Sequence, residues 1–169
     1  HNFHIEWPVI CKIARMSGAD FIHAGMWGGY YHEEEEDLRR TIAALTDGDD
    51  YEGTMPALSG GMYPGLVGAV RNRFGNDVMC SCGGSIHGHP SGTLAGTKAM
   101  RQSIDAAIKE IDLGSISLQS ELKEAIDKWG YIKYDLPKEQ NFNIVIPMAG
   151  RGQRWKDAGY IFPKPLIEI

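Results

Sequence analysis

Two glycine-containing turns carry backbone groups that are suited to binding an anion. The turns are formed by Ser59, Gly60 and Gly61 and by Gly83 and Gly84. Because glycine has no Cβ, the backbone N–H groups of such a turn can approach a phosphate without obstruction. Each turn also precedes a helical pattern, whose amino terminus would add partial positive charge. Glycines equally serve tight strand-to-helix turns, so the spacing alone leaves both interpretations open.

A second set of residues, near the end of the chain, has the types and spacing for binding a nucleotide. The set consists of Gly150, Arg151, Gly152, Arg154 and Lys164, and it follows the apolar run 143–149. Backbone N–H groups at the two glycines would surround phosphate groups. Arg154 would neutralise triphosphate charge with help from Arg151, and Lys164 would reach one phosphate as a point charge. A polar surface turn is the alternative interpretation.

The elements that must position these residues alternate between strand and helix. A helix that begins near Pro8 and ends at Gly18 comes first. Strands are predicted at 20–25, 54–61 and 76–84, and the helices after them at 32–48, 64–75, 92–111 and 117–130. Repetition of strand, glycine turn and helix is typical of βαβ units and predicts an α/β fold with a parallel sheet. The carboxyl ends of the strands, where ligands bind in such folds, would carry His23 and both glycine turns.

Several other chemically active side chains have structural interpretations. The glutamates Glu33–Glu36 would lie in the first turn of a helix, where the helix dipole favours negative charge, rather than bind a metal ion. Cys80 and Cys82 alternate along an apolar run, which indicates strand packing rather than a metal or redox pair. His87 and His89 are expected to shape the turn into the next helix.

Composition and charge exclude several classes of protein. The chain has 169 residues, of which 43% are hydrophobic and 23% charged, as in soluble globular proteins. Its net charge of −5 provides no basic field for nucleic acid or an anionic membrane. No apolar run approaches the roughly 18 to 20 residues of a membrane span, and no charged-then-apolar leader opens the chain. Three cysteines without framework spacing fit a reducing compartment, so we predict a cytoplasmic protein without nucleic-acid or membrane partners.

The segments "ARMSGADFIHAG", "MPALSGGMYPGLVGAVRNRFGND" and "GGSIHGHPSGTLAGTKAMRQSID" together resemble the carboxyl-terminal part of the RuBisCO large-chain barrel. The resemblance covers roughly residues 6–129 and implies the sixth, seventh and eighth strands of a TIM (β/α)₈ barrel. It implies that His23 and Ser59 contact one phosphate end of a sugar-bisphosphate-like substrate. The glycine turns, with Gly61, Gly83 and Gly84, would bind the other phosphate through backbone amides. A lone histidine is otherwise more often a core residue.

The loop after the first strand departs from the family's pattern. Carboxylases of this family carry a lysine there, in a pattern like G-x-x-G-K, and Tyr30 stands at that position. A phenol cannot supply the positive charge that steadies a developing carboxylate. The resemblance therefore implies a RuBisCO-like lyase or isomerase that enolises a phosphorylated sugar-derived substrate, as isomerases, enolases or decarboxylases of this kind do. A genuine carboxylase with an unusual loop and a non-catalytic phosphate-binding remnant are the alternatives.

The resemblance also implies a cofactor and an assembly for the parent enzyme. The family's Mg²⁺ site, a carbamylated lysine with nearby Asp and Glu, lies on an earlier strand that this chain lacks. No catalytic residue or metal ligand is therefore assigned within the chain, and the chain alone is expected to be inactive. The parent is expected to be a homodimer that binds a phosphorylated small molecule.

The end of the chain has a different resemblance. "IPMAGRGQRW" and "FPKPL" resemble the first motif of sugar-phosphate nucleotidylyltransferases, G-x-G-x-R followed by P-K-P-L. This implies a barrel part at 1–130, a linker at 131–142 and, at 143–169, the first strand-turn of a Rossmann-like nucleotidyltransferase domain. The metal-binding Asp of that family would lie beyond Ile169. We therefore expect a fragment, cut at both ends, of a reading frame that joins the two proteins; a natural fusion and an artefact of sequence assembly both remain open.

Overall fold

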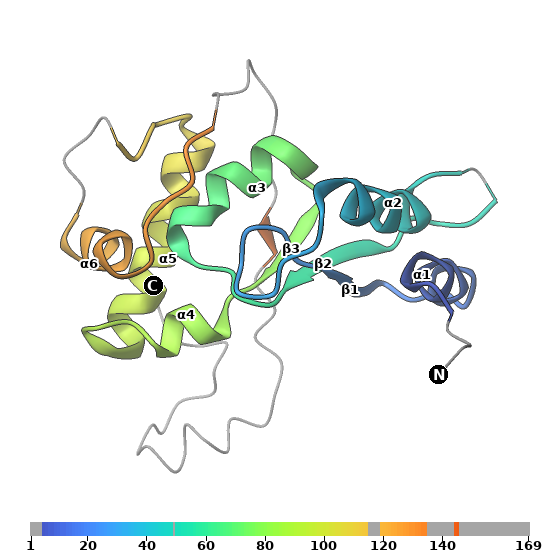
Figure 1. The fold of residues 1–169 in the computed structure, drawn as a ribbon, viewed down its shortest axis with the longest axis horizontal. Coiled ribbons are helices and arrows are strands. Elements are labelled where there is room, and N and C mark those ends of the chain that lie inside the picture. The colour runs from blue at the N-terminus through green and yellow to red at the C-terminus, as the bar shows by residue number, and fades with distance from the viewer. Residues whose placement is uncertain (1–4, 49, 115–118, 135–143, 146–169) are drawn as a thin grey trace, which may run out of the picture.

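A computed structural model describes residues 5–48, 50–114, 119–134 and 144–145 (Figure 1). The elements are α1 (Trp7–Met16), β1 (Phe21–Gly25), α2 (Glu35–Thr46), β2 (Met55–Ser59), the 3₁₀ turn η1 (Pro64–Leu66), α3 (Val67–Phe74), β3 (Val78–Ser81), α4 (Gly83–His87), α5 (Gly92–Ile108), α6 (Ser120–Trp129) and β4 (Ile144–Val145). The predicted alternation of strands and helices is confirmed, as are helix ends at Gly18, Gly75 and Gly130. The short helix α4 was not predicted as a separate element.

The strands form one parallel sheet in the order β1-β2-β3-β4. His23 pairs opposite Ala57 and Ser59 opposite Ser81, and the register between β1 and β2 shifts by one residue between His23 and Gly25. A helix lies between each of the first three strands and the next in the chain, as a parallel connection requires. The parallel sheet confirms the predicted α/β class and is consistent with part of a TIM barrel.

One continuous core holds the helices on the sheet. It includes side chains from four helices and from all of the first three strands, among them Cys11, Ala24, Leu38, Leu58, Val70, Cys80 and Met100. A smaller cluster of Ala106, Leu113 and Leu122 joins α5 to α6. Burial of this apolar surface stabilises the arrangement and fixes the strand ends relative to one another.

The strand β1 is more exposed than the apolar run 20–25 predicted. Phe21 is 56% exposed, and the side chain of His23 is also exposed. The cause is its position, because among the described residues β1 has a neighbouring strand on one side only. On the adjacent helix α1, the apolar side chains of Val9, Ile13 and Met16 are about half exposed.

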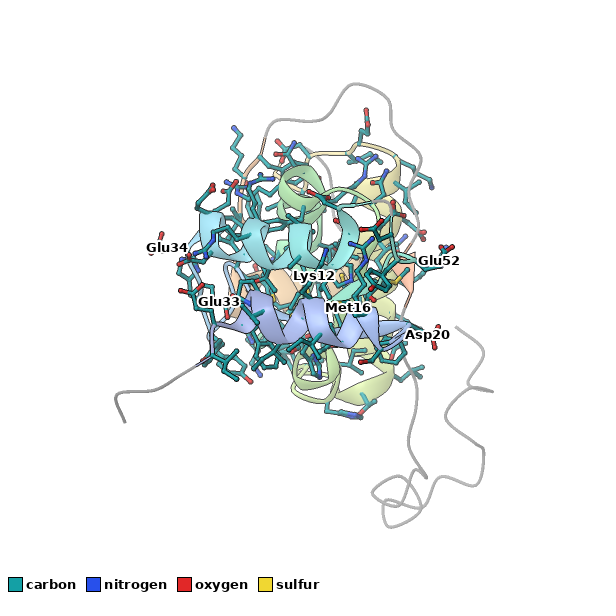
Figure 2. The ribbon with its side chains drawn as sticks, turned by 90° about the vertical axis from the view of Figure 1, so that its right-hand side faces the viewer. Lys12, Met16, Asp20, Glu33, Glu34 and Glu52 are labelled. Atoms are coloured by element: carbon teal, nitrogen blue, oxygen red, sulfur yellow. The ribbon has the colours of Figure 1, made fainter. Side chains whose placement is uncertain are left out.

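The two helices α1 and α2 lie side by side, and Figure 2 shows both ends of this layer. Glu33 and Glu34 lie at one end of the layer, and Asp20 and Glu52 lie at the other. Because Asp20 and Glu52 precede β1 and β2, this opposite placement shows that both strands run towards the end that carries Glu33. That end is the carboxyl edge of the sheet.

The helix α2 begins later than predicted. Glu35 and Glu36 lie in its first turn, as expected, whereas Glu34 is the residue before the helix and Glu33 belongs to the preceding loop. The prediction was wrong for these two residues because the backbone N–H of Glu33 instead donates to the carbonyl of Met26, at 2.8 Å. This hydrogen bond closes the loop that joins β1 to α2.

A buried arginine fixes the connection from α2 to β2. The Arg15 side chain is only 3% exposed, and its guanidinium donates to the carbonyl oxygens of Asp47, Gly48, Tyr51 and Glu52. The hydrogen bonds to Gly48 and Glu52 are both 2.9 Å long. These carbonyl groups compensate the buried charge in place of a carboxylate.

The segment after α6 also packs against the sheet's helix layer. The backbone N–H of Ile132 donates to the carbonyl of Gly65 at 3.0 Å, and the Tyr134 hydroxyl lies directly against Gly68. β4 then pairs with β3, with Ile144 opposite Val78. Residues 135–143 and 146–169 lie outside the described residues, so the division into a linker and a second domain stays a prediction. Within the described ranges, no helix is both long and apolar enough to cross a membrane.

Candidate functional site

The parallel register brings the predicted phosphate-binding residues to one edge of the sheet. Ser59 ends β2 and pairs with Ser81, which ends β3. The turns that follow, at Gly60–Gly61 and at Gly83–Gly84, therefore leave the sheet side by side. His23 lies near the end of β1, the strand next to β2.

His23 on β1 contacts Ser59 on the neighbouring strand β2. The Ser59 hydroxyl oxygen lies 2.8 Å from Nδ1 of His23. The backbone carbonyl of His23 also accepts a hydrogen bond of 2.9 Å from the Trp7 indole. His23 is exposed, so the alternative of a core histidine is wrong. The pair presents an imidazole and a hydroxyl together at the carboxyl edge, where both can contact one anion.

The Gly83–Gly84 turn is open to solvent. Both residues are exposed and form the start of α4, so they lie inside the first helical turn rather than before it. A Cβ added to either glycine would meet no atom within 4 Å. The first N–H groups of a helix lack intrahelical partners, so this turn presents donors to an approaching ligand.

The Gly60–Gly61 turn has a different environment. Its φ angles are 121° and 106°, a region that favours glycine. A Cβ on Gly60 would lie 2.7 Å from the Cβ of Tyr31, and one on Gly61 would lie 2.5 Å from the backbone nitrogen of Tyr30. The turn is therefore covered on this side by the loop after β1, which was not predicted from the sequence.

That loop is held by one hydrogen bond within it and by another to the glycine turn after β2. The N–H of Gly28 donates to Nδ1 of His32 at 3.0 Å, and the N–H of Tyr31 donates to the carbonyl of Gly60 at 3.0 Å. Tyr30, which stands at the position of the family's lysine, is 88% exposed. Its ring is therefore open to solvent at the edge of the sheet, while Cδ1 lies against Gly61 of the covered turn.

Burial changes the acidity of several groups near the site. It raises the pKa of Glu33, whose carboxylate lies against Gly25, and the neighbouring Asp37 raises it further. Burial also raises the pKa of Cys80 to about 12 and that of Cys82 to about 11. Both thiols are buried in the core. The prediction of strand packing is confirmed for Cys80, whereas Cys82 lies just after β3, at the residue before α4.

The described residues do not fit a Mg²⁺ ion. Across the described part of the chain, no group of three or more His, Cys, Asp and Glu side chains is placed to hold a metal ion. Magnesium requires several oxygen ligands in near-octahedral geometry. No step of a reaction is therefore assigned to a metal held by these residues.

The two histidines after β3 have the structural role predicted for them. His89 is buried, accepts a hydrogen bond from the N–H of Ser91 at 3.1 Å, and lies 2.9 Å from the carbonyl of Glu121. His87 lies 3.2 Å from the hydroxyl of Thr93. These contacts fix the turn between α4 and α5 and connect it to α6.

Comparison of the sequence with models of protein families identifies the family of this fold. The model described as "Ribulose bisphosphate carboxylase large chain, catalytic domain" matches residues 1–129. The chain belongs to this family. The resemblance predicted from the sequence is thereby confirmed for the barrel part. The match does not include 143–169, and Gly150, Arg151, Gly152, Arg154 and Lys164 lie outside the described residues.

Relatives within the RuBisCO large-chain family include carboxylases and enolases. The "Ribulose bisphosphate carboxylase" of Pyrococcus furiosus is 41% identical over 131 residues, which cover 76% of this chain and 31% of that protein. The "2,3-diketo-5-methylthiopentyl-1-phosphate enolase" of Geobacillus kaustophilus is 35% identical over 126 residues, which cover 73% of this chain and 30% of that protein. The chain thus spans about a third of the length of these curated relatives.

Solved structures of the RuBisCO large-chain family share the fold. A rubisco-like protein from Alicyclobacillus acidocaldarius matches with a TM-score of 0.70 and 30% identity, over 76% of this chain and 33% of that one. The octameric Rubisco of Pyrococcus horikoshii matches with a TM-score of 0.66 and 37% identity, over 72% of this chain and 29% of that one. These structures include both a Rubisco and a rubisco-like protein, so the similarity does not distinguish between their reactions. The choice between the reactions has to be argued from the site residues.

Proposed function

We propose that this chain supplies the phosphate-binding end of a RuBisCO-like enzyme, which enolises a phosphorylated sugar-derived substrate. The observation that carries the proposal is the 2.8 Å contact between His23 and Ser59, at the same sheet edge as the exposed turn at Gly83 and Gly84. The imidazole of His23 and the hydroxyl of Ser59, at the ends of β1 and β2, can hold one anionic group of a ligand. The backbone N–H groups of the turn after β3 can hold a second anionic group of the same molecule.

The residues of this chain would bind and orient the substrate. His23 and Ser59 would contact one phosphate, and the amides of Gly61, Gly83 and Gly84 would contact the other. When both phosphates are bound, the carbon chain between them is oriented along the sheet edge. This lowers the entropic cost of bringing the substrate into a reactive geometry. The proton abstraction itself belongs to the whole enzyme, for which we propose Mg²⁺ as the cofactor, held by residues outside this chain.

Enolisation is favoured over carboxylation because of Tyr30. Its exposed phenol carries no positive charge to stabilise a developing carboxylate. The relative from Exiguobacterium sibiricum, named as a 2,3-diketo-5-methylthiopentyl-1-phosphate enolase, is 41% identical over 136 residues. The equal identity of the Pyrococcus furiosus carboxylase makes carboxylation the second candidate. Since the relatives include a dimeric and an octameric Rubisco, we propose a homodimer for the whole protein, in the cytoplasm.

A phosphate titration tests the binding role. Amide resonances of the chain are followed by NMR as inorganic phosphate is added. We expect the resonances of Gly61, Gly83 and Gly84 to shift together with one dissociation constant, in the millimolar range or weaker. Gly83→Val should abolish these shifts, because the branched side chain fits the open space without a clash but occupies the place of the anion.

Gly53→Val is the matched control for this titration. Gly53 also has no atom within 4 Å of an added Cβ, and it precedes β2, at the opposite edge of the sheet. This variant should bind phosphate like the wild type. If phosphate leaves the resonances of Gly83 and Gly84 unmoved in the wild-type chain, the assignment of a phosphate site to this turn fails.

We propose a second activity, nucleotide binding, for residues 143–169. The proposal is supported by the sequence motif alone, in which Gly150 and Gly152 are followed by Arg154 and by Lys164 between two prolines. Titration calorimetry with a nucleoside triphosphate should show binding that Arg154→Ala and Lys164→Ala weaken at least tenfold. Lys138→Ala, outside the motif, is the control. Equal affinity in all four proteins would contradict the proposal.

A further inference from the structure

We propose that Trp129 is a positioning residue, which anchors the segment 128–132 as a brace between the two glycine turns. This brace consists of the end of α6 and the residues that follow it, and it contacts the connections after β2 and after β3. Its relevance to a ligand rests on the proposed function, in which the amides of Gly61, Gly83 and Gly84 bind one phosphate. The contacts of the brace do not depend on a ligand.

At one end, the brace contacts the residue that follows α4. Gly88 donates its backbone N–H to the carbonyl of Gly84 at 2.9 Å, so its position is tied to the glycine turn after β3. A Cβ added to Gly88 would lie 3.7 Å from Cζ2 of Trp129. The ammonium group of Lys128 donates to the carbonyl of Gly88. Two consecutive residues of α6 therefore hold the end of α4.

The Trp129 indole also contacts the residue after Gly88. Its ring centroid lies 6.4 Å from that of His89, with the two planes tilted by 57°. The His89 side chain is fully buried, and its Nδ1 accepts the N–H of Ser91. The proton of the neutral imidazole therefore lies on Nε2, which donates to the carbonyl of Glu121 at 2.9 Å. The beginning and the end of α6 thus hold the same connection.

At its other end, the brace contacts η1, the 3₁₀ turn that follows the glycine turn after β2. The backbone N–H of Ile132 donates to the carbonyl of Gly65 at 3.0 Å. A Cβ on Gly65 would overlap the carbonyl oxygen of Gly130 and would lie 2.7 Å from Cα of Tyr131. Any side chain at this position would push the two segments apart, so the close approach requires glycine.

The brace adds a constraint that the sheet alone does not supply. Strand pairing fixes Ser59 relative to Ser81, but the glycine turns lie beyond these last paired residues. The brace connects the segments that follow both turns and so limits how far Gly61 and Gly83 can move apart. Amides that are already placed around one anion lose less entropy on binding it. Release of the brace should therefore lower affinity for an anion without unfolding the sheet.

Hydrogen exchange tests the brace without any ligand. We expect Trp129→Ala to speed exchange of the Gly88 amide and of the Ile132 amide at least tenfold, although Ile132 lies at the other end of the brace. Trp129→Phe, which keeps an aromatic ring, should retain most of the protection. The internal reference is the Thr54 amide, which precedes β2, donates to the carbonyl of Leu45 at 2.9 Å and should be unaffected.

A titration with inorganic phosphate tests the positioning role. We expect Trp129→Ala to weaken phosphate binding at least fivefold and Trp129→Phe to bind like the wild type. Gly65→Ala, whose methyl group would displace Gly130, should weaken binding from the other end of the brace. Lys123→Gln removes an exposed ion pair with Asp127 on the same helix. It is the matched control and should change neither exchange nor affinity.

Three results would overturn the inference. The first is unchanged Ile132 exchange in Trp129→Ala, because the two ends would then be independent. The second is an equal rise in exchange at Thr54, because Trp129 would then only stabilise the whole fold. The third is unchanged phosphate affinity in a variant whose Gly88 and Ile132 amides exchange faster. Failure of the proposed function has a different signature: the wild-type chain would not bind phosphate, while both amides would still respond to Trp129→Ala.

Discussion

The Ser59 hydroxyl lies 2.8 Å from Nδ1 of His23, across the ends of two neighbouring parallel strands. If both groups contact the same anion, their contributions to affinity are coupled. We expect Ser59→Ala and His23→Gln each to weaken phosphate binding three- to tenfold, and the double variant to weaken it by less than the product. A double-mutant cycle from phosphate titrations measures this coupling. Strictly multiplicative effects would show that the two side chains act separately.

The chain alone should not fix carbon dioxide. Tyr30 provides no positive charge, and no metal site is present among the described residues. Incubation with ribulose bisphosphate and labelled bicarbonate should therefore give no acid-stable product above a control without protein. Tyr30→Lys should not restore activity, since one charge cannot replace the missing metal ligands. Product above the control in the wild type would contradict the prediction.

Arg15 should contribute strongly to stability. Its buried guanidinium holds four backbone carbonyls of the connection between α2 and β2. We expect Arg15→Met to lower the free energy of unfolding by about 2–4 kcal/mol, because these hydrogen bonds are lost together. Urea denaturation measures the change. The control is Arg40→Met, which removes only exposed ion pairs with Glu6 and Asp37 and should cost about 0.5 kcal/mol or less. Similar losses in both variants would contradict the role of burial.

The cysteine thiols should be unreactive in the folded chain. Cys11, Cys80 and Cys82 are buried, and burial raises the pKa of each thiol above its ordinary value. Because the thiolate is the reactive form, a disulfide reagent at pH 8 should label none of them within minutes. The same reagent should label all three after unfolding in urea. Rapid labelling of the native chain would show that the strand β3 or the helix α1 opens readily.

The docking of α6 should weaken in acid. Hydrogen bonds from its own backbone N–H and from Gln102 lower the pKa of Glu121 to about 2. An unfolded glutamate titrates near about 4.3, so this carboxylate stabilises the fold above that pH. The contribution should be lost as the pH falls from about 4.3 towards 2. Urea denaturation across this range measures it.

Glu121→Gln should remove that part of the pH dependence. Asp127→Asn, which changes an exposed carboxylate on the same helix, is the control and should retain it. If both variants lose stability with acid as steeply as the wild type, the hydrogen bonds of Glu121 do not carry the effect.

Local patterns in the sequence were sufficient to predict the succession of elements. The runs 20–25, 54–61 and 76–84 are short and apolar, and helical spacing follows each one, so both the strands and their common edge could be predicted. The second and third runs were predicted too long, because β2 ends at Ser59, β3 ends at Ser81, and Gly83 and Gly84 already belong to α4. Helix ends at Gly18 and Gly75 followed from the conformational preference of glycine at such positions. These features depend on residues close together in the chain.

Features that depend on residues far apart in the chain were not predicted. Nothing near Trp27 indicates that Arg73 lies over its ring, and nothing near Arg15 indicates that its partners are carbonyls of the connection after α2. The exposure of His23 was also missed, because an apolar run does not show whether a strand lies at the edge of a sheet or inside it. Such contacts arise only once the helices have packed on the sheet.

The order of the sheet has a consequence for how such a protein can evolve. Because spatial order equals chain order, each strand in the described part of the chain pairs only with the described strands immediately before and after it. Recombination within a connection between two units would therefore separate one pair of strands and leave every other pair intact. The glycine turn that follows a strand would be exchanged together with that strand. A single recombination event could thus place the carboxyl end of a new strand, with its own ligand-binding residues, next to the carboxyl end of an original strand.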